Sequence, residues 1–298
     1  MRYQVEHQTI YSYDLPVIQS QQLLHMMPRQ TPFQTCVSYT LACEPIPAEQ
    51  SQRLDFFGNH NHYLTMLATH QVLQVTSRFQ VELQPRPPIT ALMQSPAWEQ
   101  VQAMLQAQGA QHLEAVPFIY ATNRVKSSEA LAAFAKNCFT PQRSLLDAAM
   151  ALTQKIHAEF EFDAQATDVS TPLDEVLKGR RGVCQDFAHL MIGALRSLGL
   201  ACRYVSGYIL THPPPGQPRL VGADASHAWV SVYCPVYGWV DFDPTNNCLV
   251  QQEHITVAWG RDFGDVSPMR GVVLGGGRQQ LEVSVTVTPL EATTMLQV

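Results

Sequence analysis

The chain has 298 residues, a formal net charge of −6 and 46% hydrophobic residues, values that describe a globular protein with a sizeable core. The negative charge argues against a nucleic-acid partner, because phosphate contacts need a basic surface. No run of roughly 18 apolar residues occurs, so we expect no membrane span and no membrane partner.

Residues 1–88 predict an N-terminal domain rich in β-structure. Apolar and aromatic residues alternate with polar ones from Tyr3 to Tyr13 and again from Phe79 to Leu83, which is the period of half-buried strands. The segment Phe57–Asn61 has the glycine and asparagine of a hairpin turn, because both residues tolerate positive φ. We therefore expect a small antiparallel sandwich or barrel-like module that ends at the proline-rich segment 84–88.

Two further expectations concern this N-terminal region. The first residues alternate at once and lack the apolar stretch of a secretory signal, which favours a cytoplasmic location. His60 and His62 would share one face of a strand within the hairpin, where we expect them to face solvent.

Helical patterns follow, and then strands return. Three helices are predicted over residues 96–108, 145–156 and 184–198, and the last of them is amphipathic and stopped by Gly199. Strands are predicted over 201–210, 227–233 and 238–243, with a last one over 281–287. The proline-rich stretch 213–218, flanked by His212 and Arg219, is interpreted as a surface loop, and Gly275–Gly277 as a turn.

The seven cysteines are odd in number, widely scattered and without a Cys-x-x-Cys pair. This pattern fits a reducing compartment and mostly buried structural thiols, and it gives no sign of a disulfide framework or a zinc site.

Cys184 is the strongest candidate for a functional residue. It lies in the segment Arg181–Leu190, where a glycine-containing turn feeds directly into a helix. The unpaired N–H groups at a helix N-terminus favour a negatively charged sulfur, and the residue's own N–H would point outward to bind an oxyanion. The alternative is a buried structural cysteine, a role that suits the other six cysteines better.

His227 and Asp243 provide the matching base and carboxylate. The tight connection over 235–238 predicts a hairpin in which the two residues fall opposite or nearly opposite each other. A carboxylate there would hold the ring through Nδ1 and leave Nε2 for the sulfur. Asp241 has the same facing and stays a competitor, although Pro244 places Asp243 at the end of the strand, where clefts form. For His227 the alternative is a half-buried histidine without a chemical role.

A metal site is the rival use of these residue types. Cys184 and His189 lie five residues apart and diverge by about 140° around a helix. The sequence also lacks a His-x-x-x-His spacing or paired cysteines, so we expect neither a metal ion nor another cofactor.

The motifs around Cys184, His227 and Asp243 resemble the transglutaminase-like superfamily of papain-related cysteine enzymes, and the N-terminal and C-terminal segments resemble its bacterial branch. The resembling segments are Arg2–Tyr3, Asp55–Asn59, Gly182–His189, Ser226–Val230, Gly238–Trp239, Asp243–Asn246 and Gly260–Val266. The resemblance implies an α+β fold: a papain-like, transglutaminase-like core with helices packed on an antiparallel sheet, over residues 89–298, and an N-terminal antiparallel β domain.

The same resemblance implies a cysteine acyl-transfer enzyme that acts on a peptide or protein substrate through a thioester. Cys184 would be the nucleophile, His227 the general base and then acid, and Asp243 the residue that orients it. We expect hydrolysis of a peptide or amide bond; the alternatives are protein-glutamine amine acyl transfer and a non-catalytic interaction module. A second oxyanion donor is not identified, since Trp98 lies far upstream and Phe162 has no hydrogen to donate.

Overall fold

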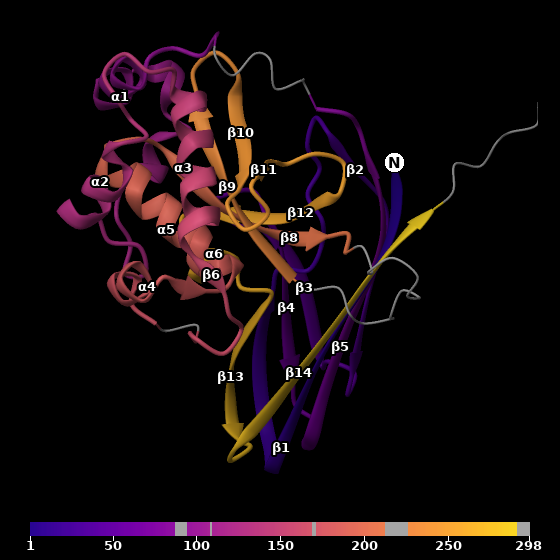
Figure 1. Ribbon diagram of the computed structural model, residues 1–298. Coiled ribbons are helices and arrows are strands. Elements are labelled where there is room, and N and C mark those ends of the chain that lie inside the picture. The colour runs from indigo at the N-terminus through magenta and orange to yellow at the C-terminus, as the bar shows by residue number, and fades with distance from the viewer. Residues whose placement is uncertain (87–93, 108, 169–170, 212–225, 291–298) are drawn as a thin grey trace, which may run out of the picture.

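Two antiparallel sheets and a group of helices make up the computed structural model, which describes residues 1–86, 94–107, 109–168, 171–211 and 226–290 (Figure 1). The larger sheet has seven strands: β1 (Arg2–Leu24), β2 (Gln34–Glu44), β3 (Glu49–Leu54), β4 (His60–Met66), β5 (His70–Leu83), β13 (Met269–Gly275) and β14 (Gln279–Leu290). The smaller sheet has the order β11-β10-β9-β8-β12: β8 (Cys202–Ile209), β9 (Ser226–Cys234), β10 (Gly238–Asp243), β11 (Cys248–Leu249) and β12 (His254–Gly260).

The helices lie on one side of the smaller sheet (Figure 1). They are α1 (Trp98–Gln106), α2 (Glu129–Lys136), α3 (Leu145–Glu159), α4 (Leu173–Gly179), α5 (Cys184–Ser197) and the short α6 (Phe263–Val266). Two single 3₁₀ turns cover Ala110–His112 and Val116–Phe118, and a short parallel pair joins β6 (Glu161–Phe162) to β7 (Arg181–Gly182). Among the described residues, none of the helices has the length and apolar character needed to cross a membrane.

The first strand, β1, is the spine of the larger sheet. Its first half, Arg2–Tyr13, pairs with β5 on one side and β14 on the other, and its second half pairs with β4 and β13. The predicted alternation is confirmed, since Tyr3, Val5 and Tyr13 are buried while their neighbours are more exposed. The region forms one curled sheet with an apolar cluster of its own, so of the two expected forms, a sandwich and a barrel-like module, the sandwich is wrong.

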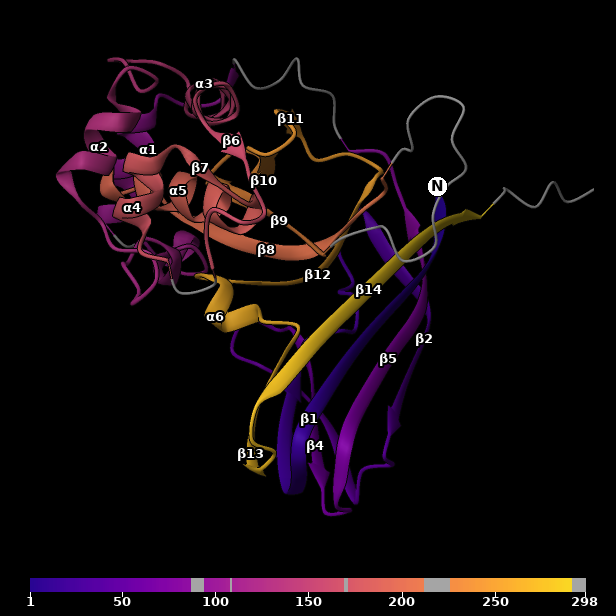
Figure 2. The ribbon, with the colours of Figure 1, turned by 60° about the horizontal axis from the view of Figure 1, so that its bottom comes forward.

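The C-terminal strands return to the N-terminal region, as Figure 2 shows for the long, adjacent ribbons of β1 and β14. The hydrophobic core is also continuous: Tyr3, Phe79 and Val285 from the larger sheet belong to the same buried cluster as Tyr208 from the smaller one. A hydrogen bond of 2.6 Å joins His7 Nδ1 to the Tyr208 hydroxyl across this junction. The division of the chain at residue 88 stays a prediction.

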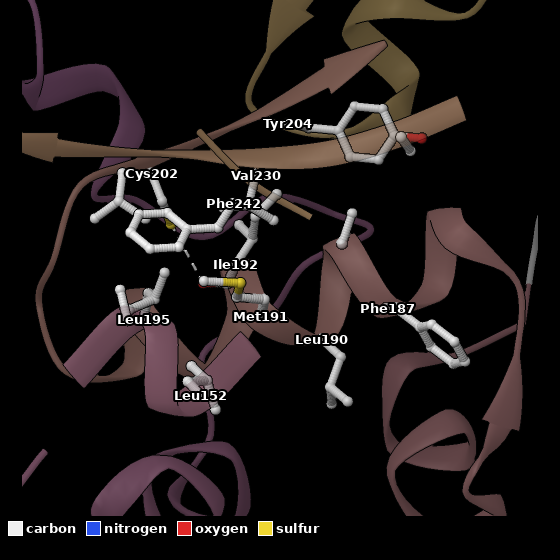
Figure 3. Close-up of a cluster of buried hydrophobic side chains, with 14 of the residues drawn as sticks. Leu152, Phe187, Leu190, Met191, Ile192, Leu195, Cys202, Tyr204, Val230 and Phe242 are labelled. Atoms are coloured by element: carbon white, nitrogen blue, oxygen red, sulfur yellow. Dashed lines mark hydrogen bonds between the residues drawn. The ribbon is translucent and has the colours of Figure 1, made fainter. Parts of the chain in front are cut away.

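The cysteine-bearing helix α5 is the central helix of the fold. The sequence predicts an amphipathic helix, but every residue from Asp186 to Arg196 is buried, because α2, α3 and α4 cover the side that faces away from the sheet. Figure 3 shows Leu190, Ile192 and Leu195 of this helix among the buried apolar side chains beside the strands. The buried Arg196 donates from Nε and Nη2 to three backbone carbonyl groups, those of Phe118, Cys202 and Arg261.

Most predicted elements match observed ones within a few residues, including the hairpin between β3 and β4 and the glycine turn after β13. Two other expectations are wrong. His62 does not face solvent; it is buried and stacks on Tyr39, with ring centroids 5.4 Å apart. Only Cys138, Cys202 and Cys234 are buried, and the other four cysteines are partly exposed. The predicted loop 213–218, with His212 and Arg219, lies outside the described residues.

Candidate active site

The turn before α5 sets the position of Cys184. Val183 is the N-cap residue and has no side-chain acceptor, so the cap is made by Asp186, whose Oδ2 accepts the Val183 N–H at 2.8 Å and the Thr167 hydroxyl at 2.6 Å. Glycine is needed at position 182, since a Cβ there would lie 2.6 Å from this Oδ2. Burial raises the pKa of Asp186, although these two hydrogen bonds oppose the shift. Cys184 is therefore the first residue of α5, where its N–H lies outside the helical hydrogen-bond ladder.

His227 and Asp243 are in direct contact. His227 is the second residue of β9 and Asp243 is the last residue of β10. The two strands pair with Phe242 opposite Val230, so the histidine is a diagonal neighbour of the carboxylate. His227 Nε2 lies 2.7 Å from Asp243 Oδ2. The expectation that Nδ1 would bind the carboxylate is wrong, because the ring presents Nε2 to Asp243 and leaves Nδ1 for the sulfur.

Asp243 is fully buried and accepts several hydrogen bonds. Besides His227, its Oδ2 is bound by His254 Nε2 at 3.0 Å and by the Asn246 side-chain amide at 2.7 Å. Its Oδ1 accepts the backbone N–H groups of Thr245 at 2.9 Å and Asn246 at 3.1 Å. These donors compensate the loss of water around a buried charge, which would otherwise be very costly.

Electrostatic coupling makes His227 a strong base. Burial disfavours its charged form, but hydrogen bonds to Asp243 and Cys184 raise the pKa of His227 from 6.5 to about 10. Burial also acts against the charge of Asp243, yet the hydrogen bonds from His227 and His254 hold the pKa of this carboxyl group well below its usual range. The arrangement therefore favours an imidazolium next to a carboxylate, with the cysteine sulfur on the other side of the ring.

Asp241, the competitor of Asp243, has a different partner. Its Oδ2 forms an ion pair of 2.9 Å with Arg86, and it lies opposite Ser231 in the hairpin, away from the start of β9 where His227 lies. Of the two aspartates, Asp243 is the one that contacts the histidine.

His254, Asn246 and Asp186 are the residues that sequence reasoning missed. Asn246 closely follows Asp243, and Asp186 is at the third helical position, so a capping pattern would have indicated both. His254 had no local signal, because β12 pairs with β8 and reaches the site only through the fold of the sheet.

Three polar side chains of the site lie close enough together to be compared with a metal-binding group. His227, Asp243 and His254 place one nitrogen or oxygen each within 4.8 Å of one another. The nitrogen–oxygen separations of 2.7 and 3.0 Å are those of direct hydrogen bonds and are shorter than the roughly 3.3 Å between ligand atoms on a tetrahedral zinc ion. We assign this group as a hydrogen-bond network.

Neither aromatic residue considered as an oxyanion donor fits that role. Trp98 donates its Nε1–H to the Thr140 carbonyl at 3.0 Å. Phe162 is exposed, and β6 aligns it with Gly182 beside the start of α5. His189, on α5 itself, accepts the Phe263 N–H at 3.1 Å and is buried against Tyr204.

A cysteine at the start of a central helix, with a histidine and an aspartate on adjacent strands of an antiparallel sheet, defines a papain-like fold. Residues 132–244 match the model of the transglutaminase-like superfamily, and residues 3–82 match the bacterial transglutaminase-like N-terminal region. The chain belongs to the transglutaminase-like superfamily and carries the bacterial N-terminal region.

Three relatives illustrate the range of similarity. An uncharacterized protein of Mycobacterium tuberculosis is 38% identical over 295 residues, covering 97% of this chain and 93% of the relative. A protein-glutamine gamma-glutamyltransferase of Pseudomonas aeruginosa is 33% identical over 99 residues, 32% of this chain and 15% of that protein. A solved structure of a candidate cysteine protease from Cytophaga hutchinsonii has the same fold, with a TM-score of 0.73 at 19% identity, covering 98% of this chain and 92% of the other.

Proposed function

We propose that this protein is a cysteine acyl-transfer enzyme that hydrolyses a peptide or amide bond, with Cys184 as nucleophile, His227 as acid and base, and Asp243 as the residue that orients His227. The observation that carries this proposal is the buried 2.7 Å contact between His227 Nε2 and Asp243 Oδ2, with Cys184 near enough to the same ring to raise the pKa of His227. Activated nucleophiles need these three parts together.

In the acylation step the Cys184 thiolate attacks the substrate carbonyl carbon and forms a carbon–sulfur bond. The Cys184 N–H binds the oxyanion of the tetrahedral intermediate. As the carbon–nitrogen bond breaks, the imidazolium of His227 gives its Nδ1 proton to the leaving amine, and a thioester remains. Asp243 keeps the ring in place throughout, because its own donors fix the carboxylate.

In the deacylation step neutral His227 takes a proton from water, and the resulting hydroxide attacks the thioester carbonyl. The carbon–sulfur bond then breaks, which releases the acid and restores the thiolate beside the imidazolium. Cys184 is partly exposed, so water has access to this step, and hydrolysis is our first choice.

Transfer of the acyl group to an amine is the second candidate. It is favoured by the 33% identity over 99 residues to a protein whose name describes protein-glutamine gamma-glutamyl transfer. The two reactions share the thioester and differ in the nucleophile that resolves it.

The test uses a glutamine-containing peptide incubated with the protein, with and without a primary amine, and analysed by mass spectrometry. Backbone cleavage or conversion of glutamine to glutamate supports the hydrolase, and an excess of amine adducts over these products would contradict it. Cys184→Ala must abolish every product, whereas Cys202→Ala, a change at a fully buried thiol on β8, must not.

A non-catalytic interaction module is the remaining alternative, and alkylation by iodoacetamide at about pH 6 distinguishes it. Burial raises the pKa of Cys43 and Cys248 to about 11, so these partly exposed thiols serve as slow internal controls. We expect selective labelling of Cys184; labelling no faster than that of an ordinary thiol would remove the basis for catalysis.

A cytoplasmic location and a peptide or protein substrate are parts of the same proposal. The odd set of seven free thiols supports a reducing compartment. Cell fractionation tests the location, and a thioester trapped on Cys184 in a His227→Ala variant exposed to cell extract would identify the substrate.

A further inference from the structure

A second histidine contacts the carboxylate of the site. His254 opens β12, and its Nε2 lies 3.0 Å from Asp243 Oδ2, the same oxygen that His227 approaches from β9. The His254 ring is buried edge-on against Trp229, with centroids 5.3 Å apart. The two imidazoles therefore share one acceptor atom.

The surroundings fix the form of this ring. Because Asp243 accepts, His254 Nε2 must carry the proton. Within the described ranges Nδ1 of His254 is buried and has no hydrogen-bond partner, so a second proton there would be an unpaired buried donor on a charged ring. His254 is thus held as a hydrogen-bond donor to the carboxylate through Nε2.

We propose that His254 is a positioning residue that acts on His227 through Asp243. It thereby sets the pH above which His227, in its reactive pair with Cys184, loses its proton. The inference rests on the proposed function. By donating to Oδ2, His254 draws negative charge away from the side of the carboxylate that faces His227. It thereby weakens the attraction between Asp243 and the imidazolium, while joining β12 to the site.

The other groups around the site decide the direction of the effect. Without His254 the carboxylate is still held by the Asn246 amide and by the backbone N–H groups of Thr245 and Asn246. Asp243 would therefore stay in place and concentrate its charge on His227. The other titratable neighbours within the described part of the chain, Cys184, Cys248 and Glu253, are unchanged by the substitution.

The experiment follows the rate of Cys184 alkylation by iodoacetamide between about pH 5 and pH 11, a range that spans the ordinary pKa values of histidine and cysteine. The inflection of the rate profile at the higher pH marks the loss of the proton from His227. In His254→Phe this upper inflection should move up by about 0.5–1 pH unit, since one hydrogen bond to the carboxylate is lost. In His254→Gln, whose amide nitrogen can replace Nε2, it should return toward the wild-type value. The proposal is overturned if the upper inflection of folded His254→Phe stays in place or moves to lower pH. It is also overturned if EDTA changes the wild-type profile, because that result would indicate a metal ion at these residues.

His112→Phe is the matched control. His112 is also buried, hydrogen-bonded at 3.0 Å to a hydroxyl group, that of Tyr233, and edge-on to that ring, but it does not touch Asp243. Its profile should be that of the wild type. If wild-type Cys184 reacts as an ordinary thiol, the proposed function itself fails; if it reacts fast and His254→Phe does not alter the profile, only the role of His254 fails.

A measurement on the wild-type protein covers the case in which His254→Phe does not fold. In ¹⁵N-labelled protein, the ring of His254 should carry its proton on Nε2, and this resonance should shift when Cys184 is alkylated, because the two are linked through His227 and Asp243. The His112 resonances should not respond. A proton on Nδ1 of His254, or no response to alkylation, overturns the proposal.

Discussion

Replacing Gly182 with alanine should damage the start of α5 and with it the reactivity of Cys184. The new Cβ would lie 2.6 Å from Asp186 Oδ2 and 2.9 Å from Asp186 Cβ. The second of these atoms is fixed to the helix backbone, so rotating the Asp186 side chain does not relieve the overlap. Either the turn or the helix must move.

The size of the effect follows from the contacts that would be lost. Loss of the cap between Asp186 and the Val183 N–H costs about 0.5–2 kcal/mol, and crowding in a packed region costs about 1–3 kcal/mol. We therefore expect the free energy of unfolding to fall by about 2–4 kcal/mol. A shift of the first helical turn would also separate the sulfur from His227, so alkylation of Cys184 at about pH 6 should slow by at least about tenfold.

Urea denaturation and iodoacetamide labelling measure the two effects on the same preparations. Gly179→Ala is the control, because Gly179 ends α4 and a Cβ there would meet nothing within 4 Å. That change should leave labelling unaltered and stabilise the helix by up to about 1 kcal/mol. If Gly182→Ala unfolds within about 0.5 kcal/mol of the wild type and is labelled equally fast, the account of this turn is refuted.

Three further predictions test the network and the junction of the two sheets. Asp243→Asn should lower turnover by about 10²–10⁴-fold, since the charge that holds His227 is lost. Asp241→Asn, which removes the charge next to Arg86 and Arg203 and does not touch His227, should cost much less turnover; steady-state rates of the two variants compare them directly. The pKa of His227 is raised from 6.5 to about 10 in the folded state, so its contribution to stability is complete below pH 6.5 and is lost as the pH rises through 10. In urea unfolding, the free energy of unfolding should therefore fall over this window by up to about 1.4 kcal/mol per pH unit. The fall should be weaker in Asp243→Asn. Tyr208→Phe should cost about 1–3 kcal/mol of stability by leaving Nδ1 of His7 without its partner, while Nε2 stays bound to Thr9, and Cys184 labelling should be unchanged; equal unfolding midpoints would contradict the role of that hydrogen bond.

The parts of the site that could be predicted from the sequence are those with a local pattern. Cys184 follows a glycine turn and starts a helix, and His227 and Asp243 lie on two strands joined by a tight connection. The choice of ring nitrogen could not be predicted, because it depends on the diagonal register of β9 and β10. His254 could not be predicted either, since its place depends on pairing between β12 and β8.

The same distinction applies to the fold. The alternation in β1 is visible in the sequence, but its partners in β13 and β14 are about 245 to 290 residues away, and no local pattern indicates them. Periodicity suggested one exposed face for α5, yet the surrounding helices bury it on all sides. Long-range packing decided both outcomes.

The pairing of β1 with the last strands has a consequence for biosynthesis. One side of Arg2–Tyr13 has β14 as its partner, so this edge must wait, unpaired, until Gln279–Leu290 has left the ribosome. An open strand edge invites pairing with other chains, and closing so long a loop is slow. The nascent protein is therefore most prone to aggregation just before this segment emerges, and a chain cut short ahead of residue 279 would keep that edge exposed.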